Sequence, residues 1–186
     1  MQTKSLNGVI GLVVASAAMI GLAHAGYNLR RVPTPEEIAG WNIDVNREGK
    51  GLPAGSGSVK QGKEVYDNQC TSCHGDKGQG GIGDKLVGGQ GTLSAPSPVK
   101  TVGSYWTYAT TLFDYIRRSM PLNAPQSLSN EEVYAVSAYI LHMNGLLPED
   151  ARLDAKSLTA IKMPNRNGFV SDPRPDVKDK ACMKNC

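Results

Sequence analysis

Two cysteines and a histidine form a short motif in this chain, and their side chains are of types that can bind a metal or a cofactor. They are Cys70, Cys73 and His74, in the segment NQCTSCHGDKGQGG at residues 68–81. Pairs of the form C-x-x-C serve in redox-active dithiols, in zinc sites and in covalent attachment of haem. The surrounding residues help to separate these three chemistries.

Covalent haem attachment uses all three residues of the motif. A zinc site needs about four ligands, and a histidine directly beside a ligating cysteine gives poor tetrahedral geometry. A thioredoxin-type dithiol expects a strand before the motif, whereas apolar residues recur at helical spacing over 59–69. We therefore predict one haem c, with Cys70 and Cys73 bound to its vinyl groups and His74 as the proximal iron ligand.

A methionine is expected as the second axial ligand, because a thioether favours ferrous iron and blocks exogenous ligands. Met120 and Met163 each precede a proline, and Met120 lies in a loop between two predicted helices. Met163 lies beyond the last predicted helix, and Met143 lies inside a helix, where packing is the ordinary role. Met120 is the predicted ligand, with Met163 and packing-only roles as the alternatives.

The sequence predicts that the segments which position these residues are helices. One is expected at about 58–70, ending at the motif, and a second at 108–119, ahead of Met120. Ser129 opens a third with a capping box, and Gly145 closes it. No convincing strand is present, so we predict a small all-α fold whose haem supplies much of the buried apolar surface.

The start of the chain predicts the compartment. Residues 1–25 contain Lys4, an apolar run and a small-x-small site at Ala23-His24-Ala25. This pattern is typical of a cleavable signal peptide and predicts a periplasmic protein, with an uncleaved anchor as the alternative. The formal net charge of +3 comes without a basic run, so neither nucleic acid nor stable membrane insertion is expected.

Two arms are expected to flank a haem domain at 58–145. The N-terminal arm is 26–57 and the C-terminal arm is 146–186. The chain from Lys162 onward has few apolar residues, so we expect it to bind a partner, with Phe169 as the anchor. Cys182 and Cys186 are predicted to form a disulfide, with free thiols or an intermolecular bridge as the alternatives.

With these features the chain resembles the class I cytochrome c family. In that family a glycine and an aromatic residue of the first helix cross an aliphatic and an aromatic residue of the last. Gly62 and Tyr66 match the first pair, and Val136 and Tyr139 match the second. The resemblance implies the class I fold over about 58–145 and the same haem ligands.

A closer resemblance includes the flanks. Several stretches look like the cytochrome subunit of the sulfane dehydrogenase of the periplasmic Sox system of sulfur and thiosulfate oxidation: TPEEIAGWNIDVNREGKGLPAGSGS, the region from SYWTYATT to AYIL, KMPNRNGF and DPRPDV. This resemblance implies an electron-accepting subunit without substrate chemistry of its own. Its partners would be a molybdenum-cofactor dehydrogenase subunit and a downstream c-type cytochrome or oxidase.

Two other functions stay open, a free-standing electron shuttle and a haem peroxidase or gas sensor whose methionine dissociates. Tyr105 and Trp106 could donate hydrogen bonds in the haem pocket or simply pack beside it. Arg117 and Arg118 could mark a docking rim, or could be solvated charges at a helix end, which we favour.

Overall fold

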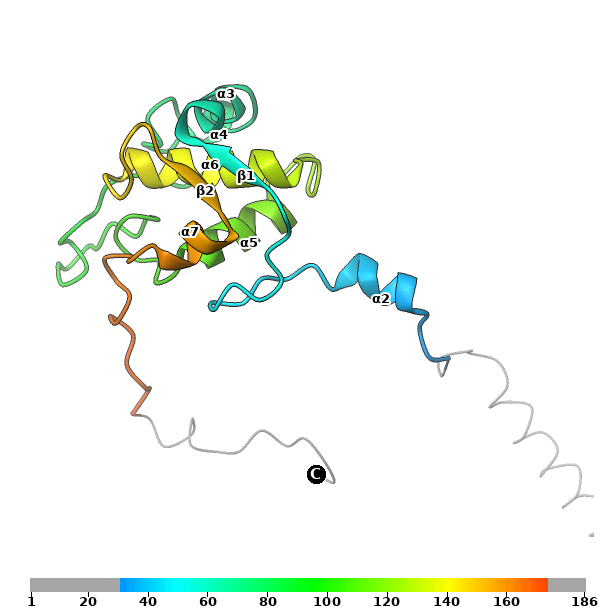
Figure 1. Ribbon diagram of the computed structural model, residues 1–186. Coiled ribbons are helices and arrows are strands. Elements are labelled where there is room, and N and C mark those ends of the chain that lie inside the picture. The colour runs from blue at the N-terminus through cyan, green and yellow to red at the C-terminus, as the bar shows by residue number, and fades with distance from the viewer. Residues whose placement is uncertain (1–30, 174–186) are drawn as a thin grey trace, which may run out of the picture. The chain divides into compact units, whose positions relative to one another are not determined.

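The computed structural model describes residues 31–173, which fall into two units that divide after Asn42 (Figure 1). The expected signal peptide at 1–25 and the expected Cys182–Cys186 disulfide lie outside the described residues. Among residues 31–173 no helix is long and apolar enough to cross a membrane.

The first unit contains one described helix, α2, at Pro35–Trp41. Thr34 caps it, with a hydroxyl that accepts from the Glu37 N–H while the Glu37 carboxylate accepts from the Thr34 N–H. Pro35 occupies the first helical turn, where its missing N–H costs nothing.

The second unit is mainly helical, as predicted. Its helices are α3 Val59–Gln69, α4 Thr71–His74, α5 Ala109–Ser119, α6 Asn130–Met143 and α7 Ala155–Ala160. The capping boxes at Ser58 and Ser129 begin α3 and α6, and Gly145 follows α6 with a φ of 72°, as a closing glycine requires.

Two short strands correct the expectation that the chain contains none. β1 at Ser56–Ser58 pairs antiparallel with β2 at Arg152–Asp154, with Gly57 opposite Leu153. The pair packs across α6 (Figure 1). Three residues are too few to show the alternation that marks a strand in a sequence.

The first and last helices of the haem domain cross at a glycine. A Cβ built on Gly62 of α3 would overlap the backbone carbonyl of Ala135 in α6, so only glycine permits this approach. One turn further, the rings of Tyr66 and Tyr139 meet edge to face at 5.4 Å. The crossing is as the resemblance implied, except that Gly62 meets Ala135 and Tyr139, with Val136 buried beside them.

Much of the chain expected to form arms packs into this compact unit. Val45 is buried, and its N–H donates to the Asp114 carboxylate at 2.7 Å. At the other end, Leu153, Leu158 and Met163 are buried in the same core. Residues 152–163 therefore belong to the packed domain, and the stretch that could extend freely is shorter than 146–186.

Candidate cofactor site

The C-x-x-C-H motif lies where α3 ends and one further helical turn begins. Cys70 is the C-cap residue that follows α3, and its N–H donates to the Tyr66 carbonyl at 2.9 Å. The turn α4 is closed by the His74 N–H, which donates to the Cys70 carbonyl at 2.9 Å. Residues three and four apart lie on the same face of a helical turn. Cys73 and His74 therefore lie on the same face as Cys70.

The two thiols are unpaired, as attachment to a haem requires. Cys70 is partly buried and Cys73 is exposed, and neither is in a disulfide. Burial, and then the neighbouring Cys73, raises the pKa of Cys70 to about 11. A redox-active dithiol needs the opposite, a lowered thiol pKa, so this geometry argues against thioredoxin-like chemistry.

His74 is held in the orientation that an axial ligand needs. Its Nδ1 lies 2.7 Å from the Asp84 carbonyl oxygen, which can only accept, so Nδ1 carries the proton and Nε2 is free for a metal. Gly83 lies against the ring, and a Cβ there would come within 2.8 Å of Cε1. A backbone carbonyl gives no sequence signal, so this contact was not foreseen.

Tyr66 ties α3 to the turn that follows the motif. Its hydroxyl donates to the Gly75 carbonyl at 2.8 Å, and its ring is fully buried. Burial is the main cause that raises the pKa of Tyr66 to about 12. The phenol therefore stays protonated and keeps this hydrogen bond at neutral pH.

The glycine-rich loop folds back onto the motif and is then fixed to α6. The Gly80 N–H donates to the His74 carbonyl at 2.8 Å, and the Gly83 N–H donates to the Cys73 carbonyl at 2.9 Å. Further along, buried Asn144 donates to the Leu86 carbonyl at 3.1 Å and accepts from the Gly88 N–H at 3.3 Å. Sequence reasoning missed Asn144, although its place just before the closing Gly145 was a usable signal.

Met120 caps the C-terminal end of α5 and packs, partly buried, against the core. Its N–H donates to the Ile116 carbonyl at 3.0 Å, which places the residue where the helix ends. Met163 is 2% exposed within the apolar core. Packing therefore accounts for Met163, while Met120 retains accessible surface.

Arg117 and Arg118, which precede Met120, both form hydrogen bonds within the domain. Arg118 forms a two-pronged ion pair with Asp114, and Asp114 also holds the Val45 N–H. Arg117 donates to the Ile43 carbonyl at 2.9 Å. Both residues lie in the last turn of α5 and Arg118 stays 47% exposed, but they also tie residues 43–45 to this helix.

The segment before α5 is covered by the chain that follows α7. Asn165 donates to the Tyr105 carbonyl at 2.6 Å, and the Phe169 ring meets the Tyr105 ring at 5.2 Å. Arg166 lies over the Tyr108 ring at 4.2 Å. Trp106 is partly buried and packs on the core. Phe169 thus has a partner within its own domain.

These residues fit a covalently bound haem. Two free thiols, a histidine with an available Nε2 and a partly buried methionine are the groups that attach and ligate it. Within the described part of the chain, no three His, Cys, Asp or Glu side chains gather as a cluster that could hold a metal ion. Partly buried apolar side chains near the core could cover its faces: Leu86, Trp106, Leu128 and Met143.

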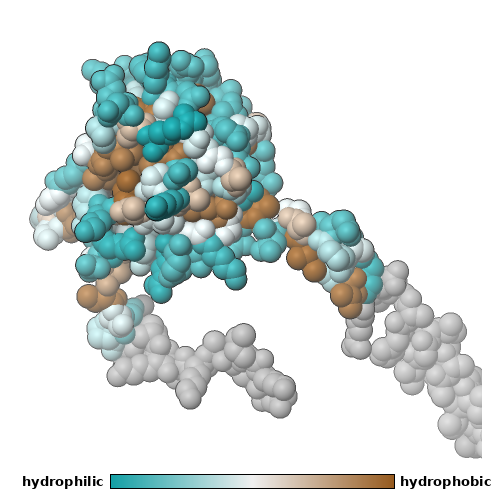
Figure 2. All heavy atoms as spheres, in the orientation of Figure 1, coloured by the Kyte–Doolittle hydropathy of each residue, from teal (hydrophilic) through white to brown (hydrophobic). Residues whose placement is uncertain are grey.

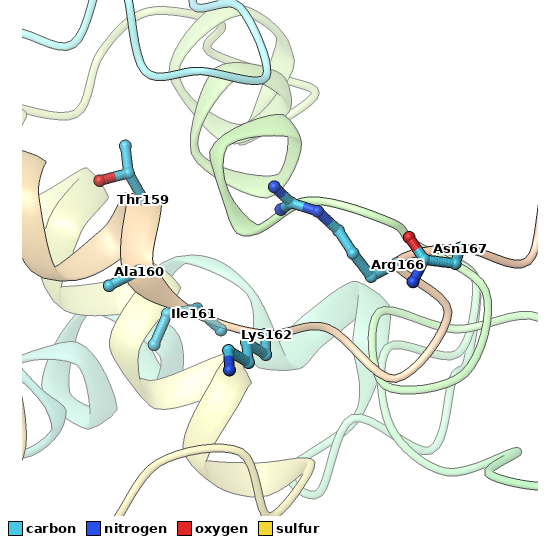
Figure 3. A pocket seen from close by; sticks show the side chains of 6 residues that line it. All are labelled: Thr159, Ala160, Ile161, Lys162, Arg166 and Asn167. Carbon is cyan, nitrogen blue, oxygen red and sulfur yellow. The ribbon is translucent and has the colours of Figure 1, made fainter.

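A separate hollow lies at the end of α7 (Figure 3). It is lined by Thr159, Ala160, Ile161, Lys162, Arg166 and Asn167. Figure 3 shows Lys162 pointing away from Arg166, and the Thr159 hydroxyl already donates to the Lys156 carbonyl at 2.8 Å. Its polar groups do not converge on a ligand, and none of its lining residues belongs to the motif.

Comparison with known proteins agrees with this geometry. The family model for cytochrome c matches residues 59–144. The crystal structure of the sulfane dehydrogenase SoxCD from Paracoccus pantotrophus matches with a TM-score of 0.75 and 41% sequence identity. The match covers 86% of this chain and 81% of that chain.

Two curated relatives are thiosulfate dehydrogenases. The protein from Stutzerimonas stutzeri is 35% identical over 114 residues, and the protein from Allochromatium vinosum is 29% identical over 144. These matches cover 60% and 74% of this chain. The chain spans only 35% and 49% of the length of these relatives.

Proposed function

The chain belongs to the cytochrome c family and carries covalently bound haem c, and we propose that it is the electron-accepting subunit of a molybdenum-containing dehydrogenase that oxidises sulfur compounds. The similarity to a chain of SoxCD carries this proposal, because it extends well beyond the residues that the cytochrome c family model matches. A sulfane or sulfite group is the substrate class that follows.

In this proposal each site residue has one task. Cys70 and Cys73 would attach the haem, and His74 and Met120 would be the ligands of its iron. The Asp84 carbonyl fixes the His74 ring in one tautomer, which leaves Nε2 free to bind the iron. When bound, the haem supplies one-electron redox chemistry.

The number of electrons transferred in each step implies that the chain acts between two partners. Oxidation of a sulfur substrate at molybdenum releases electrons in pairs, whereas a single haem site takes one at a time. The subunit must therefore discharge to a downstream cytochrome or oxidase between two loadings. The motif side of the domain supports such an exit, since Ile82, in the loop after the motif, is 95% exposed.

We infer that the protein works in the periplasm. The signal-peptide pattern at 1–25 supports this location, and attachment of haem to paired thiols fits a compartment outside the cytoplasm. The match to SoxCD favours the subunit role over the shuttle and sensor alternatives.

Thiosulfate oxidation by the chain itself is a second candidate, favoured by the two thiosulfate dehydrogenases. The chain spans less than half of either protein, so we prefer a subunit role.

One experiment separates these functions. The tagged protein is purified from its native source and assayed for molybdenum, for haem and for reduction of the haem band by sulfite or thiosulfate. The subunit proposal expects molybdenum and haem to elute together, with sulfur-dependent reduction only in the complex. Reduction of the isolated chain by thiosulfate would favour the second candidate. Elution of haem without molybdenum would contradict the first.

A further inference from the structure

Helix α2 has seven residues and is stabilised by several local contacts, which a passive linker would not need. Isolated helices this short are marginal in water. Here Thr34 and Glu37 form a reciprocal capping box, and Pro35 starts the helix. Arg31 donates to both oxygens of the Glu37 carboxylate, at 2.5 and 2.7 Å. These contacts stabilise the helix locally.

The same helix buries none of its residues. Ile38 is 48% exposed and Trp41 is 88% exposed, and residues three apart lie on the same face of a helix. Figure 2 shows apolar surface along α2. A tryptophan side chain carries a large apolar area, and together with Ile38 it gives α2 an exposed apolar face.

The charges of α2 limit what can cover this face. Glu36 and Glu37 both have lowered pKa values, Glu36 mainly through a hydrogen bond to its own backbone N–H and Glu37 mainly through Arg31. Both carboxylates are therefore ionised at neutral pH, and the helix itself contains no basic residue. Arg31 already neutralises Glu37, so Glu36 is the acidic charge that remains on the helix, and a basic side chain at the rim of a protein groove would complement it.

The structural match identifies which protein to expect. The match to SoxCD covers 86% of the 186 residues, which is about 160 residues, so any continuous stretch of that length includes 35–41. The cytochrome c family model begins only at residue 59. α2 thus lies outside the cytochrome c family model, and an ungapped match of that length places it within the part shared with a chain of this dehydrogenase.

We propose that α2 is a docking helix whose Ile38 and Trp41 insert into an apolar, basic-rimmed groove on the molybdenum-containing dehydrogenase subunit. This inference rests on the proposed function and adds the surface that holds the two subunits together. Trp41 is the expected anchor, because tryptophan is enriched among the few residues that dominate an interface. The contact would hold the two subunits together between electron transfers.

The test compares single variants of the full-length chain, expressed with a tag in the native source. Trp41→Ala and Ile38→Ala are measured beside Val170→Ala, a matched control that is 87% exposed in the second unit. The readouts are the molar ratio of molybdenum to haem after purification, the haem content per chain and the melting temperature. We expect Trp41→Ala to weaken the complex about 30-fold or more and to lose molybdenum. Haem content should stay constant in all three variants.

Each other outcome has a defined meaning. If the wild-type chain elutes without molybdenum, the proposed function fails and the docking helix fails with it. If the wild type keeps molybdenum and Trp41→Ala keeps it equally, the docking helix alone is overturned. Equal loss in Val170→Ala, or a fall of several degrees in the melting temperature of isolated Trp41→Ala, also overturns it. The second result would mean that the haem domain itself covers α2.

Discussion

At the scale of single residues, the site depends on how the His74 ring is held. The Asp84 carbonyl accepts the Nδ1 proton, and Gly83 leaves room for the ring beside it. Groups that orient a metal-bound histidine commonly change metal affinity or activity 10- to 100-fold when they are lost. Here the orienting atom belongs to the backbone, so a substitution must act through Gly83.

Gly83→Ala should displace the imidazole, because the new Cβ would lie 2.8 Å from Cε1 and 3.0 Å from Nδ1. We expect a shifted haem potential and an altered absorption spectrum, measured by potentiometric titration. Gly40→Ala is the control, since a Cβ there meets nothing within 4 Å. A Gly83→Ala protein with the wild-type potential would show that the ring has space to spare.

The sixth ligand gives a second residue-scale prediction. Met120→His should keep a folded haem protein but lower its potential, because a nitrogen donor stabilises ferric iron relative to a thioether. Met163→Leu should leave the spectrum and potential unchanged and cost less than about 1.5 kcal/mol of stability, as a volume-conserving core change does. Potentiometry and thermal unfolding measure both effects. A spectrum controlled by Met163 instead would contradict the assignment.

At the scale of elements, local sequence signals predicted the helix ends, which depend on residues close together in the sequence. The capping box at Ser129 and the closing Gly145 marked the ends of α6, and the helix before the motif was placed to within a residue. The β1–β2 pair could not be foreseen, because it joins segments far apart in the sequence and each is three residues long. The burial of Met163 depends on the same long-range packing, and the sequence around it shows no helical or alternating apolar pattern.

Tyr66 links two of these elements and should make the domain sensitive to alkali. Its folded pKa of about 12 lies above the ordinary value of 10, so its contribution to stability is full below pH 10. That contribution is lost as the pH rises from 10 towards 12, where the unfolded chain ionises first. Tyr66→Phe should cost about 1 kcal/mol at pH 7, through the lost bond to the Gly75 carbonyl, and should flatten this alkaline decline. Chemical unfolding at pH 7, 10 and 11.5 tests it, and an unchanged decline would assign the effect to other groups.

At the scale of the whole molecule, chain on both sides of the family-model match is built into the haem domain. Val45 reaches α5 through Asp114, and residues 152–163 complete the core through Leu153, Leu158 and Met163. Composition predicted arms because these stretches are rich in polar residues, yet a few well-placed apolar side chains suffice to anchor them. The partner contact that we assigned to the tail on sequence grounds stays a prediction, since Phe169 contacts Tyr105 but is still 59% exposed.

Truncation distinguishes chain that belongs to the domain from chain that does not. A stop after Ile161 removes Met163 from the core, the Asn165 bond to the Tyr105 carbonyl and the ring contact of Phe169. Loss of one buried methionine alone costs about 2–5 kcal/mol, so this variant should melt far below the wild type and lose haem during purification. A stop after Pro173 keeps all three contacts and should retain the wild-type melting temperature and haem content. Calorimetry and the haem-to-protein absorbance ratio measure the difference. Equal stability of the two truncated chains would mean that residues 162–173 contribute nothing to the domain on which they pack.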